Sequence, residues 1–149
     1  MKITLTWTPS GATQPTSFVL ADSPATIPLS NFRINGARDI QEAQFFRAVA
    51  RQFYDRGNRR TEITFDTTRL FASQLAAESF ILMHETQFPS QTQNPGMFLA
   101  AFIAGASGGQ TATRYLKNAV VESIASAISG CTTKHSYKIT GGVMSNNPN

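Results

Sequence analysis

Apolar and polar residues alternate in several short segments of the chain, which is typical of strands with one buried face. The first such segment is KITLTW, residues 2–7, where Ile3, Leu5 and Trp7 alternate with polar residues. The clearest is TEITFDTTRLF, residues 61–71, in which Ile63, Phe65 and Phe71 fall on odd positions. We therefore expect a strand at each place, with the odd-numbered side chains of the second one facing a core.

Three further segments have a weaker strand pattern. SFVLA, residues 17–21, is a short apolar run between prolines, and MFLAAFIA, residues 97–104, has the composition of a buried strand. In HSYKIT, residues 135–140, alternate side chains from His135 to Ile139 share one face. The polar residues 91–95 and the glycine-rich residues 105–113 are expected to form loops.

One segment, ASQLAAESFILMHETQF, has the period of an amphipathic helix. Ser73 is placed to cap its N-terminus, and Pro89 prevents the helix from continuing beyond it. Ala76, Phe80 and Met83 recur at helical spacing, so we expect them on the buried stripe.

Residues 43–54 and 116–129 are ambiguous, because their apolar positions fit both a strand and a helix. Gly57 and Asn58 form a turn signal between the first segment and the strand at residues 61–71, which favours a hairpin that turns there. The second segment is rich in β-branched residues, and Gly130 suits either a hairpin turn or the end of a helix. We interpret both segments as strands.

The length of the chain indicates a single domain, residues 1–149, and its composition predicts a surface with few charged groups. Charged residues make up only 15% of the chain, and uncharged polar residues are plentiful, which suits a protein that packs against copies or partners. A net charge of +4 is small for a dedicated nucleic-acid binder. The alternating N-terminus has no apolar core of an export signal, and no apolar window is long enough to span a membrane.

The chain offers few groups for catalysis or metal binding. Its one cysteine, Cys131, would lie about 13 Å from His135 on an extended strand, too far for a hydrogen bond. His84, near the end of the predicted helix, is interpreted as a structural residue that faces the negative end of the helix dipole. The two histidines lack the spacing of a zinc site, and no lysine follows the glycine-rich loop as phosphate binding requires. We therefore expect no enzyme activity, metal or cofactor.

The stretch RQFYDRGNRR, residues 51–60, concentrates arginine, aromatic and turn residues. Two interpretations are open: its arginines contact phosphates while an aromatic ring stacks on a base, or the stretch is a hairpin tip that contacts protein. Asp55 and Glu62 flank the arginines and favour the protein contact. The candidate interface residues are Arg51, Tyr54, Arg56, Asn58, Arg59 and Arg60.

Two segments, GNRRTEITFDTTRLFASQLAAESFILMH and NAVVESIASAISGCTTKHSYKITGG, together about half the chain, resemble structural proteins of bacteriophage tails. The resemblance is to the tail-tube and distal-tail group, and it rests on pattern and element order. It implies an α+β fold that is mainly β, a β-sandwich or rolled barrel with one amphipathic helix packed on it.

The same resemblance implies assembly into rings, commonly hexameric, that stack or cap a tube and bind other tail or baseplate proteins. The protein would then be located in the virion tail, and in the host cytoplasm during assembly. Long hairpins would reach neighbouring rings, and an open strand edge such as that of residues 2–7 would accept a neighbour's strand. Because tube lumens generally carry acidic charge, the basic balance favours a baseplate, hub or neck-adjacent component. A small nucleic-acid-binding domain that uses residues 51–60 is the alternative.

Overall fold

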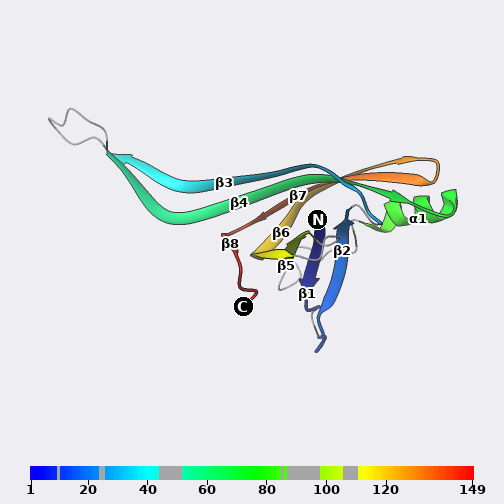
Figure 1. The fold of residues 1–149 in the computed structure, drawn as a ribbon, viewed down its shortest axis with the longest axis horizontal. Helices are drawn as coiled ribbons and strands as arrows, with labels where there is room; N and C mark the ends of the chain where they lie inside the picture. Colours follow the sequence, from blue (N-terminus) through cyan, green and yellow to red (C-terminus); the bar gives the residue numbers. More distant parts are fainter. Residues whose placement is uncertain (10, 24–25, 44–51, 85, 87–97, 106–110) are drawn as a thin grey trace.

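The fold, seen in a computed structural model, consists mainly of strands with one helix (Figure 1). The structure describes residues 1–9, 11–23, 26–43, 52–84, 86, 98–105 and 111–149. The elements are β1 Lys2–Trp7, β2 Thr16–Asp22, β3 Leu29–Ala43, β4 Gln52–Leu70, α1 Gln74–His84, β5 Phe98–Ala104, β6 Ala112–Ser129, β7 Thr132–Gly141 and β8 Met144–Ser145. The predicted α+β class, dominated by strands, is thus confirmed, including the strand interpretation of residues 116–129.

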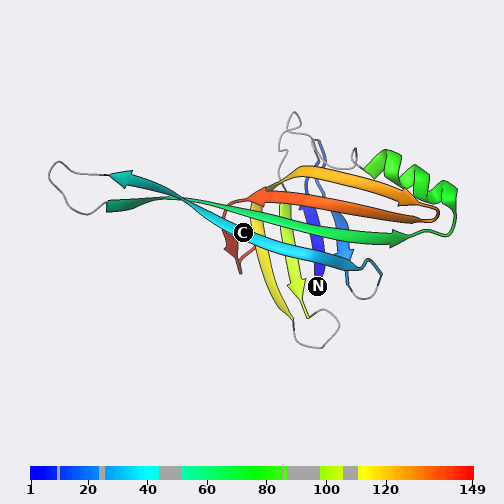
Figure 2. The same cartoon turned by 90° about the horizontal axis from the view of Figure 1, so that it is seen from above.

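All the strand pairs are antiparallel, and the strands follow the order β2-β1-β5-β6-β7-β4-β3, with β8 beside β6. The half that contains β1, β2 and β5 runs across the half that contains β3, β4 and β7 (Figure 2). The sheet is not closed, because β2 and β3 end it without pairing with each other. Residues 2–7 therefore lie inside the sheet, between β2 and β5, so the expected open edge at this strand is wrong.

Strand β6 belongs to both halves of the sheet and bends between them. Residues 112–119 pair with β5, and residues 120–129 pair with β7. The register shifts next to Asn118, whose φ of 50° lies in the left-handed region that asparagine tolerates. A bulge of this kind bends a strand and increases its twist, so β6 can leave one half of the sheet and enter the other.

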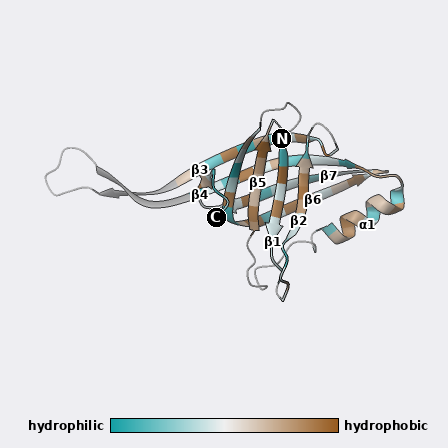
Figure 3. Cartoon of the chain, turned by 60° about the horizontal axis from the view of Figure 1, so that its bottom comes forward, coloured by the Kyte–Doolittle hydropathy of each residue, from teal (hydrophilic) through white to brown (hydrophobic). Residues whose placement is uncertain are grey.

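The two halves bury a common core of aliphatic and aromatic side chains. Hydrophobic residues, brown in Figure 3, recur along the strands. The large, fully buried members of the core include Ile3 and Leu5 of β1, Ile63 and Phe65 of β4 and Leu116 of β6. Ile3, Leu5, Ile63 and Phe65 occupy positions that the alternation of residues 2–7 and 61–71 predicts to be buried. The segment HSYKIT also buries its odd positions, since Tyr137 and Ile139 belong to the same core.

Helix α1 begins where the sequence predicts. The hydroxyl oxygen of Ser73 accepts a hydrogen bond from the backbone N–H of Ala76, at 3.2 Å, as an N-cap residue does. The buried stripe differs from the prediction, because Ala77 and His84 are buried while Ala76 and Met83 are exposed. Because apolar residues lie on both sides of the helix, its sequence pattern is compatible with two different buried stripes.

The turn expected at Gly57 and Asn58 is wrong, because both residues lie inside β4. Ile40 pairs with Asp55 and Arg38 pairs with Arg59, so β4 has two more residues than β3 between these pairs. Gly and Asn favour a bulge for the same reason that they favour a turn, namely tolerance of unusual backbone angles. The expected loop at residues 91–95, most of the loop at 105–113 and Pro89 lie outside the described residues.

Of the two alternatives left open for Gly130, the structure has the hairpin turn, between β6 and β7. Ser129 pairs with Thr132, and Gly130 has a φ of 60°, so Gly130 and Cys131 form the turn of a hairpin. Of the described helical residues, no segment has both the length and the apolar character that crossing a bilayer requires.

Gly141 allows β7 to approach the bend in β6. A Cβ atom placed on Gly141 would lie 2.6 Å from Cγ of Leu116, whereas a Cβ atom on the neighbouring Gly142 would meet nothing within 4 Å. We expect Gly141→Ala to lower the free energy of unfolding by roughly 1–3 kcal/mol, because Leu116 is fully buried and has little room to move.

Urea unfolding of Gly141→Ala and of the matched control Gly142→Ala measures this effect. The control is expected to change stability by less than about 0.5 kcal/mol. Equal stability of the two variants would contradict the close approach at the bend.

Candidate functional site: the hairpin arm and the clusters at its two ends

Strands β3 and β4 form a long two-stranded arm that extends from the body of the protein (Figures 1 and 2). Strand β7 accompanies β4 only from Thr61 to Leu70. Residues 37–43 and 52–60 therefore pair only with each other among the described residues. At about 3.4 Å per residue, this part of the arm is roughly 30 Å long.

The candidate residues predicted from RQFYDRGNRR fall mainly on this arm. Tyr54, Arg56, Asn58 and Arg59 belong to β4, where Arg56 and Asn58 fall in the register shift, whereas Arg51 lies outside the described residues. Tyr54 is the register partner of Gln41, and Arg59 is the register partner of Arg38. These residues therefore extend along a strand and do not gather at a hairpin tip.

Arg60, at the root of the arm, belongs to an ion cluster on the solvent-facing side of the sheet. Its guanidinium lies 2.6 Å from Glu62 and 3.5 Å from Glu122, and the ammonium of Lys138 lies 3.3 Å from Glu122. Thr140 donates a hydrogen bond to Glu122 at 2.7 Å. The hydrogen bond from Thr140 and the one from Lys138 lower the pKa of the Glu122 carboxyl.

The pairing of β4, β6 and β7 creates this cluster, because their register places distant residues side by side. The sequence analysis placed Glu62 beside the arginines but predicted no contact between Arg60 and Glu62. Glu122 and Lys138 are partners that the sequence analysis missed. Arg60 therefore has partners within its own chain, and its charge is largely balanced there.

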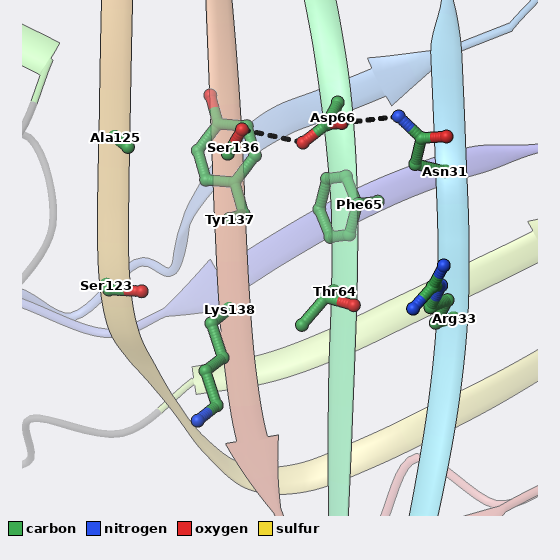
Figure 4. Close-up of a pocket in the computed structure, with 10 residues that line it drawn as sticks. All are labelled: Asn31, Arg33, Thr64, Phe65, Asp66, Ser123, Ala125, Ser136, Tyr137 and Lys138. Atoms are coloured by element: carbon green, nitrogen blue, oxygen red, sulfur yellow. Dashed lines mark hydrogen bonds between the residues drawn. The ribbon is translucent and has the colours of Figure 1, made fainter.

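A shallow groove lies farther along the same sheet face (Figure 4). Asp66 accepts hydrogen bonds from Asn31 at 2.7 Å and from Ser136 at 2.6 Å. The bond from Asn31 is the main reason that the pKa of Asp66 is lowered. Asn31 has a positive φ of 53° and lies where the register of β3 shifts. Its hydrogen bond to Asp66 stabilises this irregularity of the edge strand.

At the end of the body opposite the arm, Arg69 connects β4, β2 and α1. Its guanidinium donates a hydrogen bond to the backbone oxygen of Val19 in β2, at 2.7 Å. The guanidinium also lies over the rings of Phe18 and Phe80, at 5.3 Å and 4.9 Å from their centroids. Such cation–π contacts strengthen when the cation is removed from water, and burial lowers the pKa of Arg69.

The two histidines are distant in the sequence, but the side chains of His84 in α1 and His135 in β7 lie next to each other in the interior. The rings of His84 and His135 are 4.8 Å apart, and both side chains are buried. His84 Nε2 is hydrogen-bonded to the hydroxyl of Tyr137 at 2.5 Å, and the nitrogens of His135 lie 2.8 Å from the hydroxyls of Ser126 and Thr133. His84 is in the last turn of α1, as predicted, but it packs in the interior.

The histidine cluster connects α1 to the sheet, which is a structural role. Burial, together with smaller contributions from the neighbouring His84 and Arg69, lowers the pKa of His135 to about 4. Burial also raises the pKa of Tyr137 to about 12. The hydrogen bond between His84 of α1 and Tyr137 of β7 holds the helix against the strand, while the partners of His135 lie on β6 and β7. The described residues contain no group of three or more histidine, cysteine or acidic side chains arranged to hold a metal ion.

Comparison with known proteins adds no identification: no protein-family model matches this chain, and no curated protein matches its sequence.

The histidine cluster predicts acid sensitivity. Because the pKa of His135 is about 4 in the folded state and about 6.5 when unfolded, the folded state binds fewer protons between these values. Stability is therefore complete above about pH 6.5 and falls as the pH decreases toward 4. We expect a loss of roughly 1–2 kcal/mol between pH 7 and pH 5.

Urea unfolding at both pH values measures the loss, and His135→Gln is the comparison. The variant is less stable at pH 7, but its stability should change less between pH 7 and pH 5. An equal pH dependence in the two proteins would contradict the lowered pKa of His135 in the folded state.

Arg69 should contribute to stability through its contacts with the rings of Phe18 and Phe80 and through its hydrogen bond to the Val19 oxygen. We expect Arg69→Met to lower the free energy of unfolding by roughly 1–3 kcal/mol, because the Val19 oxygen loses a charged donor. Arg33→Met, at an exposed position of β3, removes the same charge and is expected to have little effect. Similar unfolding midpoints for the two variants would contradict the role of Arg69.

Proposed function

We propose that this chain is a virion structural protein of a bacteriophage tail, a tail-tube, distal-tail or baseplate/hub component that assembles into rings and catalyses no reaction. Its partners are copies of itself and other tail or baseplate proteins, in the virion tail and, during assembly, in the host cytoplasm. Within such a ring we propose that the open sheet acts as the β-sandwich or rolled barrel of that group, with α1 packed on it.

The observation that carries this proposal is the arm. A two-stranded ribbon without a third strand or a core is only marginally stable in water. Residues 37–43 and 52–60 have no third strand among the described elements, yet they continue the pairing of the body for several residues. A partner surface that packs on the arm would supply the missing burial, and copies of the same chain would be present at high local concentration in a ring.

The ends of the sheet give a second support. Strands β2 and β3 each have one side without a paired strand among the described elements. Unpaired edges accept strands from other chains unless they are protected. Because β3 is also part of the arm, a neighbour that adds to its edge could contact body and arm together.

The arm's basic charge is the observation that favours the alternative, a nucleic-acid-binding domain. Residues 37–60 contain six arginines and three acidic residues. A basic ribbon can follow a phosphate backbone, with affinity that falls steeply as salt increases. The intrachain partners of Arg60 weaken this alternative, since part of the positive charge is already balanced.

Substituting Arg56, Arg59 and Arg60 together with alanine separates the two functions. If the arm contacts protein, the variant should lose its oligomers, with a drop in self-association of at least about tenfold, because several charged contacts are removed. Light scattering over a concentration series measures the mass, and titration with labelled DNA at two salt concentrations measures nucleic-acid affinity.

The matched control replaces with alanine three exposed cations that lie outside residues 37–43 and 52–60, namely Arg33, Arg114 and Lys134. Both variants lower the net charge equally, so a general charge effect would appear in both. If the arm variant alone loses salt-sensitive DNA binding while its oligomer mass is unchanged, the result would contradict ring assembly through the arm and support the nucleic-acid-binding function.

A further inference from the structure

The shallow groove on the solvent-facing side of the sheet has a volume of about 370 Å³. It crosses four neighbouring strands, β6, β7, β4 and β3, so the sheet itself forms its floor (Figure 4). The floor consists of the small side chains of Thr64, Ser123, Ala125 and Ser136. Pockets of this volume are at the lower end of the range that holds small molecules, and the floor offers mainly hydroxyl groups. We call this the sheet groove.

Asp66 lies in the sheet groove and is held there from two sides. Asn31 of β3 donates a hydrogen bond to one carboxylate oxygen, and Ser136 of β7 donates one to the other oxygen. These two bonds lower the pKa of Asp66, so the group is ionised at neutral pH. Because a carboxylate has about four acceptor sites, each oxygen of Asp66 can accept a further hydrogen bond from a ligand.

A bulge in β3 directs Asn31 toward this carboxylate. Asn31 has a φ of 53°, and the register of β3 and β4 shifts between Ser30 and Arg33. Bulges change the direction of a side chain, and unusual backbone conformations of residues other than glycine are concentrated at functional sites. The unfavourable conformation of Asn31 therefore fixes the orientation of an acceptor group on the solvent-facing side.

Arg33 provides a free donor close to this acceptor. It is exposed, and its guanidinium has no partner among the residues that the structure describes. Arg33 is the register partner of Thr64, two residues before Asp66, so Arg33 and Asp66 are diagonal neighbours whose Cβ atoms lie roughly 7 Å apart. The other cation of the groove, Lys138, is paired with Glu122 and carries no part of the argument.

The combination of Asp66 and Arg33 disfavours charged ligands. An anion that approaches Arg33 also meets the negative charge of Asp66, and a cation that approaches Asp66 also meets the guanidinium of Arg33. An apolar ligand would remove these groups and the floor hydroxyls from water without replacing their hydrogen bonds. The sheet groove therefore suits a neutral ligand with several donors and acceptors.

Neighbouring hydroxyl groups on one neutral molecule satisfy this arrangement. One hydroxyl can donate to Asp66 while the next accepts from Arg33, and further hydroxyls can bond to the floor. Saccharides carry such adjacent hydroxyl groups. An uncharged peptide also donates and accepts, but recognition of a peptide depends on pockets for its side chains, and Ala125 contributes only a methyl group to the floor.

We propose that the sheet groove binds a neutral saccharide through two adjacent hydroxyl groups, one bonded to the carboxylate of Asp66 and the other to the guanidinium of Arg33. Hydrogen bonds to charged groups are the stronger ones, so these two residues supply most of the affinity. The rings of the lining residues Phe65 and Tyr137 are buried in the core, so neither stacks on the sugar. For a shallow site of this kind we expect a dissociation constant on the order of 1–10 mM. The site lies within one chain and does not depend on ring assembly.

Saturation-transfer difference NMR, which detects weak ligands even of large assemblies, tests the inference with glucose, galactose, mannose and N-acetylglucosamine. At least one of these neutral sugars should bind the unmodified chain with the expected dissociation constant. Glucuronate and protonated glucosamine are the negatively and positively charged counterparts of glucose. Both should bind at least about threefold more weakly than the best neutral sugar.

Two variants remove one charged group each, with opposite consequences. Arg33→Met and Asp66→Asn should each weaken binding of the neutral sugar by about tenfold, because each loses a hydrogen bond to a charged group. Asp66→Asn should bind glucuronate more tightly than the unmodified chain does, whereas Arg33→Met should bind glucosamine more tightly. Loss of folding would weaken all ligands alike, so these opposite changes identify the site.

Lys134→Met is the matched control. Lys134 is exposed on the same face of β7 as Ser136 but does not line the sheet groove, so its loss should leave all affinities unchanged.

Three results would overturn the inference. They are no binding of any of the four neutral sugars at about 100 mM, a preference of the unmodified chain for a charged sugar, and neutral-sugar affinities of Arg33→Met and Asp66→Asn that equal that of Lys134→Met. An acetylated, amidated trialanine peptide that binds when the sugars do not would also overturn it and assign the groove to peptide. Each of these results leaves the proposed ring assembly standing.

Discussion

Strand β6 must serve both halves of the sheet, and its bend depends on a left-handed backbone at Asn118 and on the space that Gly141 leaves for Leu116. Because β6 changes partner from β5 to β7 at this bend, the two halves can face each other and bury one core. The same bend sets the direction of β7 and β4, and therefore the direction in which the arm leaves the body.

Polar groups stabilise the places that the core does not reach. At one end, Arg69 and the buried histidines connect β2, β4, β7 and α1 through a few directed contacts. At the other end, an ion cluster around Glu122 joins the strands from which the arm emerges. The first set is buried and sensitive to protonation, whereas the second is exposed and screened by salt. The two ends should therefore respond to different solution conditions.

The arm and the exposed side chains Leu75, Leu82 and Met83 of α1 share one property, namely that the described part of the chain does not cover them. Surfaces of this kind lower the solubility of a monomer but gain burial in an assembly. Their location at opposite ends of the body favours repeated contacts over a single symmetric pair. The low share of charged residues is consistent with such a role, since uncharged polar groups are easier to remove from water.

The sequence by itself determined the strands near residues 2–7, 17–21, 61–71, 97–104 and 135–140, the buried face of residues 61–71, and the start of α1 at Ser73, because alternation and capping depend on neighbouring residues. Strand β3 was not among the predicted strands. Only the tertiary structure decided which strands pair. It placed residues 2–7 inside the sheet, turned the Gly57–Asn58 signal into a bulge, and brought His84 beside His135 and Glu122 beside Arg60. Such contacts depend on register and on the bend in β6, which local patterns do not encode.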